Sequence, residues 1–113
     1  MKAINLASKK ELASNLVTAD RLFTRMKGLL GRSSLMEGEA LWIKPCNGIH
    51  TFGMRFVIDA VFLNRENRVV AVVERLQPYR LTRLYGDAAS VIELPAGTID
   101  MTATHIRDEI EIV

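Results

Sequence analysis

The chain has a single cysteine, only three prolines and no run of about 20 apolar residues. One cysteine cannot form an internal disulfide, which excludes a disulfide scaffold and agrees with a reducing compartment. The lack of a long apolar run excludes a secretory signal and a membrane-spanning helix. We therefore expect a cytoplasmic protein without a membrane span.

The chain also lacks a strong excess of either charge. Fifteen basic residues stand against 13 acidic ones, and the net charge of +2 is too small to support nucleic-acid or membrane binding by itself. With 49% hydrophobic and 25% charged residues, the composition is typical of a globular protein. A length of 113 residues suits one domain, residues 1–113, in which roughly two-thirds of the unfolded surface is buried.

The hydrophobic periodicity changes along the chain. Residues 4–17 predict two short strands or a hairpin. An amphipathic helix capped by Thr18 is predicted over 18–30, because the apolar side chains there follow helical spacing at Leu22, Phe23, Met26, Leu29 and Leu30. Residues 57–63 and 69–73 predict a central antiparallel hairpin around a turn at 64–67.

Further strands are expected at 41–43, 90–94 and 109–113, and a short second helix after Pro95. The predicted fold class is α+β. It is a compact, mainly antiparallel sheet or partly closed barrel, with one amphipathic helix near the N-terminus and a possible second short helix.

The segment from Cys46 to Arg55 gathers the cysteine, one of two histidines and two glycines into ten residues. Cys46 and His50 are too few to hold a metal, because structural zinc needs four ligands and catalytic zinc three plus water. We therefore predict no metal and no cofactor. Cys46 can act as a nucleophile with His50 as its base, although a lone cysteine at a strand end is more often buried for packing.

Two carboxylates interrupt apolar strands. Asp59 lies within residues 56–63, where burial without a partner would cost several kcal/mol, so it needs hydrogen-bond donors. If a four-residue turn sets the register, Asp59 lies opposite Val72, and the loop of His50 and Thr51 is the expected source of its partner. We interpret Asp59 as a structural anchor rather than a general base. Glu93 alternates with apolar neighbours, and we expect it in solvent or in a surface pair.

A third cluster interleaves basic and aromatic residues after the hairpin. Such a pattern is found on surfaces that bind single-stranded nucleic acid or other anions. A solvated loop explains the same residues, and the small net charge argues against nucleic acid. The residues concerned are Arg75, Tyr79, Arg80, Arg83 and Tyr85.

Three motifs resemble those of a widespread prokaryotic family, domain of unknown function 192, also called uncharacterised protein family 0127. They are residues 25–32, the block from Cys46 to Leu63, and residues 93–97. The resemblance runs from Leu16 to the C-terminus and implies a β-rich single domain with an early helix, but no established activity. Another branch of the family carries Trp where this chain has His50, which argues against His50 as an obligatory base. Many relatives look exported, so the resemblance does not extend to localisation.

The sequence thus favours a non-catalytic ligand-binding or protein-interaction module with an unknown small molecule or protein as partner. One alternative is a small hydrolase or transferase that uses Cys46 or His50 with Asp59. Another is a weak binder of single-stranded nucleic acid. The candidate pocket comprises Cys46, His50, Thr51, Met54, Arg55, Asp59 and Glu93.

Overall fold

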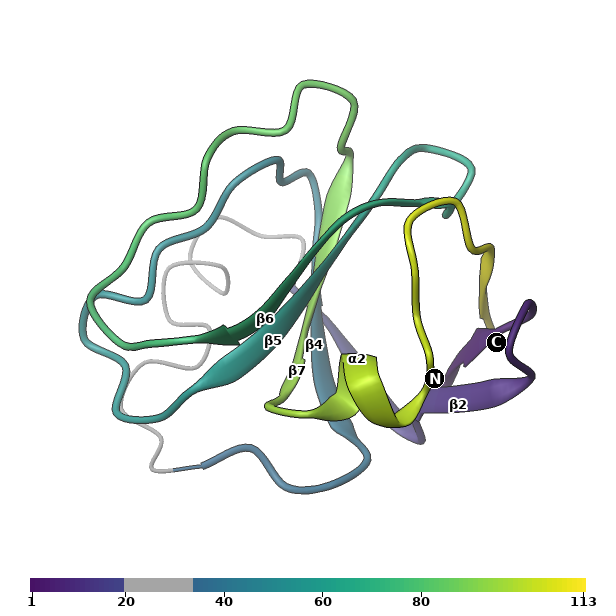
Figure 1. Ribbon diagram of the computed structural model, residues 1–113, viewed down its shortest axis with the longest axis horizontal. Coiled ribbons are helices and arrows are strands. Elements are labelled where there is room, and N and C mark those ends of the chain that lie inside the picture. Colours follow the sequence, from purple (N-terminus) through teal and green to yellow (C-terminus); the bar gives the residue numbers. More distant parts are fainter. Residues whose placement is uncertain (20–33) are drawn as a thin grey trace.

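The computed structural model describes residues 1–19 and 34–113. Within these residues the chain forms two sheets and one short helix (Figure 1). The elements are β1 (Ala3–Asn5), β2 (Lys10–Ala13), β3 (Asn15–Ala19), β4 (Glu39–Ile43), β5 (Ile58–Leu63), β6 (Val69–Leu76), β7 (Ser90–Pro95), α2 (Thr98–Met101) and β8 (Ile110–Ile112).

The larger sheet has the order β3-β4-β7-β5-β6 and the smaller one the order β2-β1-β8. All pairs are antiparallel except β3 with β4, which run parallel. Every residue of β5 is buried, because β5 lies between β7 and β6 and both faces of the sheet are covered. This position explains its continuous apolar sequence.

The main hydrophobic core combines residues of both sheets. Leu63, Ile92 and Leu16 from the larger sheet pack in one cluster with Ala3 and Ile110 from the smaller sheet. The opposite face of the larger sheet carries a second cluster, which includes Phe62 and Val91. The connecting loops after β4 and β6 pack on this second face.

Most strand predictions are confirmed. The central hairpin, the strands at 39–43, 90–95 and 110–112, and the short second helix all form. The described part of the chain is β-rich, and its two sheets remain separate rather than closing into a barrel.

The prediction of a helix that starts at Thr18 is wrong. Thr18 and Ala19 belong to β3 and pair with Trp42 and Ile43. The periodicity could not reveal this pairing, because the partner strand lies more than 20 residues away. The rest of the predicted helix, residues 20–30, lies outside the described residues.

The predicted register of Asp59 is also wrong. Val61, not Asp59, lies opposite Val72, because the loop between the paired Leu63 and Val69 holds five residues rather than four and the pairing shifts by one more residue between Phe62 and Leu63. The pairing then shifts between Ile58 and Ala60, where two residues of β6 face the single Asp59. Such a bulge bends and twists the strand that carries the extra residue.

Asp59 holds this bulge and the start of α2. Its Oδ1 accepts the backbone N–H of Arg75 at 2.9 Å, and its Oδ2 accepts those of Gly97 at 3.1 Å and Ile99 at 2.9 Å. Arg75 and Gly97 have φ values of 52° and 95°, so the carboxylate stabilises two left-handed turns. The role of anchor is the one the sequence favoured, but the partners come from these turns and not from the loop of His50.

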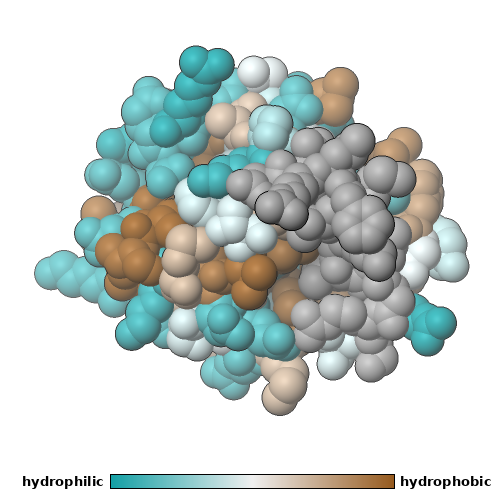
Figure 2. Space-filling model, turned by 180° about the vertical axis from the view of Figure 1, so that it is seen from behind, coloured by the Kyte–Doolittle hydropathy of each residue, from teal (hydrophilic) through white to brown (hydrophobic). Residues whose placement is uncertain are grey.

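Apolar side chains also reach the surface, and Figure 2 shows a band of them on the back of the molecule, bordered by hydrophilic side chains. On the described surface, four large exposed apolar side chains come from two loops, one between β4 and β5 and the other between β6 and β7. They are Phe52, Tyr79, Leu81 and Leu84. These loops define the candidate site. None of the described helices is long and apolar enough to cross a membrane.

Replacing Asp59 by Ala should lower the free energy of unfolding by about 3–5 kcal/mol, because three backbone donors then lose a charged acceptor inside the protein. Urea unfolding measures the loss. The matched control is Asp100→Ala in α2, where the side chain is exposed and the expected change is within about 0.5 kcal/mol. An Asp59→Ala variant as stable as the control would disprove the anchor.

Candidate functional site

Two loops that are distant in sequence lie side by side at the end of the molecule away from the chain termini (Figure 1). One comprises residues 47–55, between β4 and β5, and the other residues 77–85, between β6 and β7. Backbone hydrogen bonds join them from Tyr85 N–H to Asn47 O and from Thr51 N–H to Arg80 O, both at 2.9 Å. We call these two segments the loop pair.

Two threonine hydroxyls reinforce the loop pair. Thr51 is fully buried, and its Oγ1 donates to Gln77 O at 2.6 Å and accepts from Arg80 N–H at 2.9 Å. Thr82 acts in the opposite direction, since its Oγ1 accepts from Ile49 N–H at 3.0 Å. Each loop therefore supplies a side chain that satisfies the backbone of the other.

The loops also approach each other closely at Gly48. A Cβ atom added there would lie 2.7 Å from Leu84 Cδ2 and 3.3 Å from Arg83 O. Glycine is the residue that permits this distance. The two backbones thus form a single supported unit.

The loop pair presents a row of exposed rings. The ring of His50 stacks on Phe52, with centroids 5.3 Å apart and planes at 26°, and Phe52 is followed by Tyr79 at 6.5 Å. Phe52 is 45% exposed and Tyr79 64%. Leu81 and Leu84 are more exposed still. The sequence alone does not single out Phe52, Leu81 or Leu84, because it does not show that the two loops are neighbours.

The charges of the loop pair have one sign. Arg55, Arg80 and Arg83 are exposed, and neither segment contains an aspartate or a glutamate. The nearest carboxylates in sequence are Glu74 and Asp87, which flank the second segment, and Asp59 beyond the first. This uneven distribution is visible in the sequence once the two loops are known to be neighbours.

The proposed catalytic groups are each engaged by backbone atoms. Cys46 Sγ donates to Gly48 O at 3.2 Å, and His50 Nδ1 accepts from Phe52 N–H at 3.2 Å. Asp59 belongs to the other face of the sheet, since it alternates with Ala60 and shares its side with Val61 of the main core. The structure therefore groups Cys46 with His50 in one loop and does not bring Asp59 to them.

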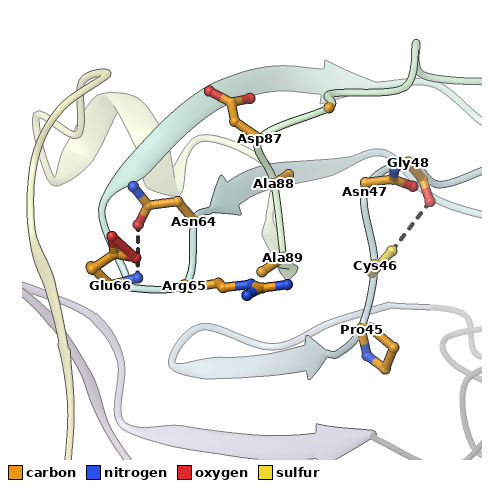
Figure 3. A pocket seen from close by; sticks show the side chains of 11 residues that line it. Pro45, Cys46, Asn47, Gly48, Asn64, Arg65, Glu66, Asp87, Ala88 and Ala89 are labelled. Carbon is orange, nitrogen blue, oxygen red and sulfur yellow. Dashed lines mark hydrogen bonds between the residues drawn. The ribbon is translucent and has the colours of Figure 1, made fainter.

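Cys46 lines a cleft of about 790 Å³ next to the loop pair (Figure 3). Its walls are Pro45 to Gly48, the hairpin turn Asn64 to Glu66, and Gly86 to Ala89. The charged side chains of this cleft are Arg65, Glu66 and Asp87, so it carries both signs. Within residues 1–19 and 34–113, no three His, Cys, Asp or Glu side chains are placed to hold a metal ion.

Glu93 is buried, with 4% of its surface exposed, so the expectation that it faces solvent is wrong. The reason is that β7 is an inner strand, where Glu93 lies between Leu41 of β4 and Ala60 of β5. Burial raises its pKa from 4.5 to about 7. In the described part of the chain no hydrogen bond reaches its carboxyl group.

The remaining candidates divide between core and surface. Met54 is buried against Ile58 and Leu76 and is part of the core. The ring of Tyr85 packs on Phe62 at 4.7 Å and is half-buried, and Arg75 contributes its backbone to the bulge. Tyr79, Arg80 and Arg83 remain exposed; Tyr79 lies next to Phe52 of the other loop, and the guanidinium group of Arg83 lies over the ring of Tyr85 at 5.3 Å.

Comparison with known proteins gives a family and a fold. The sequence profile of the family DUF192, described as "Uncharacterized ACR", matches residues 4–112. A UPF0127 protein of Pyrococcus furiosus is 26% identical over an alignment 113 residues long. The alignment covers 96% of this chain and 95% of that protein.

Two crystal structures are similar in fold. A protein of unknown function from Novosphingobium aromaticivorans has a TM-score of 0.83 at 17% identity, with 98% of this chain and 82% of that one covered. A putative transcription regulator from Sinorhizobium meliloti has a TM-score of 0.80 at 17% identity, with 97% and 89% covered. The profile match over nearly the whole length shows that the chain belongs to the DUF192 family.

Proposed function

We propose that the protein is a non-catalytic binding module whose ligand-contacting surface is the loop pair. The observation that carries this proposal is the exposure of aromatic and apolar side chains on two loops whose backbones bond to each other. An exposed ring on a supported backbone loses little conformational freedom when it binds a ligand. Such an arrangement is typical of recognition surfaces, in which rigid aromatic side chains supply most of the contact energy.

The geometry gives less support to catalysis. A nucleophile needs a base within hydrogen-bond reach, and the base needs a third group to orient it. Here the thiol of Cys46 donates to Gly48 O, and His50 Nδ1 accepts a backbone N–H. Asp59 is saturated by three backbone donors on the far face of the sheet.

The proposal replaces the pocket inferred from the sequence by a surface. Of the seven candidate pocket residues, His50 and Arg55 are exposed on the loop pair, while Thr51 supports it from below. Asp59 and Met54 contribute to stability rather than to contact. Glu93 lies on the face of the larger sheet that the loops cover. Because it is buried there, it affects the stability of the fold rather than contacts with a ligand.

A thermal-shift screen of nucleotides, oligonucleotides, sugar phosphates and acidic peptides tests whether the loop pair binds a ligand. A ligand at 100 times its dissociation constant stabilises the fold by about 2.7 kcal/mol, which raises Tm by on the order of 10 °C. We expect at least one anionic compound to stabilise wild type but not Arg80→Gln/Arg83→Gln. The matched control Lys2→Gln/Arg68→Gln removes the same charge from outside the loop pair and should respond like wild type. A screen without any shift, or a shift retained by the loop-pair variant, contradicts the proposal.

Alkylation of Cys46 tests the enzymatic alternative. Because the thiol donates its hydrogen to Gly48 O and is half-buried, iodoacetamide at pH 7 should modify it more slowly in the folded protein than in urea. Mass spectrometry follows the reaction. Faster labelling in the folded state would indicate an activated thiolate and favour the enzyme.

Glu93→Gln should remove a specific pH dependence of stability. The carboxyl group binds its proton more tightly in the folded state, so its contribution is complete below pH 4.5 and is lost as the pH rises to about 7. At pH 8 the variant should exceed wild type in free energy of unfolding by up to about 3 kcal/mol, and the two should converge near pH 4.5. Urea unfolding at the two pH values checks this. A constant difference between them would mean that Glu93 is ionised in the folded protein.

A further inference from the structure

The loop pair has the features of a platform for stacked bases, and this inference rests on the proposed function. The rings of His50, Phe52 and Tyr79 form a continuous row, with neighbouring centroids 5.3 and 6.5 Å apart. Every nucleobase has a flat π-face that can stack on such rings without regard to sequence. His50 and Phe52 each cover one face of the other, so unpaired bases can stack on the outer faces of this row of rings.

The charges around the rings suit a polyanion. Arg80 and Arg83 follow Tyr79 within four residues, and Arg55 lies on the neighbouring loop. With no acidic residue in residues 47–55 or 77–85, nothing within the loop pair repels a phosphate. The chain as a whole carries only +2, so a small net charge conceals a locally basic surface.

The combination distinguishes between classes of partner. A duplex hides the faces of its bases and leaves only phosphates for the arginines, so the exposed rings favour an unpaired strand. An apolar protein surface would fit Leu81 and Leu84, but it gives no role to the three arginines, for which the described residues supply no ion-pair partner. An acidic peptide fits the arginines and gives no particular role to a row of rings.

We propose that the loop pair binds single-stranded nucleic acid. Bases stack on the rings of His50, Phe52 and Tyr79. Phosphates bind the guanidinium groups of Arg55, Arg80 and Arg83. The hydrogen bonds of Thr51 hold the two loops in register before the strand arrives, so little ordering accompanies binding.

Fluorescence anisotropy with labelled dT and U oligonucleotides of about 15 nucleotides tests the inference, since single-strand-binding domains of other folds cover up to about 16 nucleotides. Three phosphate contacts predict a slope of log affinity against log salt near −2, which is a loss of about 20-fold between 50 and 200 mM salt. Arg80→Gln/Arg83→Gln should reduce the magnitude of the slope by about 1.4. Lys2→Gln/Arg68→Gln should leave both affinity and slope unchanged.

A second pair of variants isolates stacking from charge and from general hydrophobicity. Tyr79→Phe keeps the ring and should keep the affinity. Tyr79→Leu keeps an apolar side chain of similar length without a ring and should weaken binding by about fivefold or more. Tyr79 is exposed, so both variants should fold, which circular dichroism verifies.

The outcomes separate this inference from the proposed function. Binding of a labelled poly-glutamate peptide, but of no oligonucleotide, with loss in Arg80→Gln/Arg83→Gln, overturns the nucleic-acid inference and leaves the binding module intact. Equal affinity for Tyr79→Leu and Tyr79→Phe, or tighter binding of duplex than of single strand, overturns stacking. Equal weakening by the control Lys2→Gln/Arg68→Gln overturns the assignment to the loop pair.

Discussion

The structure depends most on the carboxylate of Asp59, which gathers three backbone donors from two distant segments. The contact with Arg75 stabilises the bulge that ends the regular pairing of β5 with β6, and the contacts with Gly97 and Ile99 fix the turn into α2. Because the bulge immediately precedes residues 77–85, the same carboxylate sets the direction in which the second loop leaves the sheet. A buried charge thus positions a surface that it does not touch.

The larger sheet uses its two faces differently. One face packs on the smaller sheet and forms the main core, and the other supports the loop pair through Ile49, Tyr85 and their neighbours. Ile49 and Tyr85 pack on the second face, while His50 and Tyr79 point to solvent. Each loop therefore contributes an inner residue that anchors it and an outer residue that can meet a ligand.

The sequence predicted the strands well, because alternation and apolar runs are local signals. It could not predict the parallel pairing of β3 with β4, nor the burial of Glu93, because both depend on the order of strands in the sheet. Asp59 was recognised as an anchor from its apolar neighbours, but its donors are backbone groups that carry no sequence signal. The candidate site was found as two separate halves. Phe52 is not distinctive in its own loop. It becomes part of a row of rings because Tyr79 of the other loop lies next to it.

The bonding between the loops also constrains how the protein can vary. Residue 49 is matched to residue 82, and residue 51 to residue 80, while a side chain at Gly48 would displace Leu84 and press on the carbonyl oxygen of Arg83. An insertion in one loop alone would break this register, so lengths should change in both loops together or in neither. Substitutions at the outward-facing positions would change the chemistry of the surface while its shape persists.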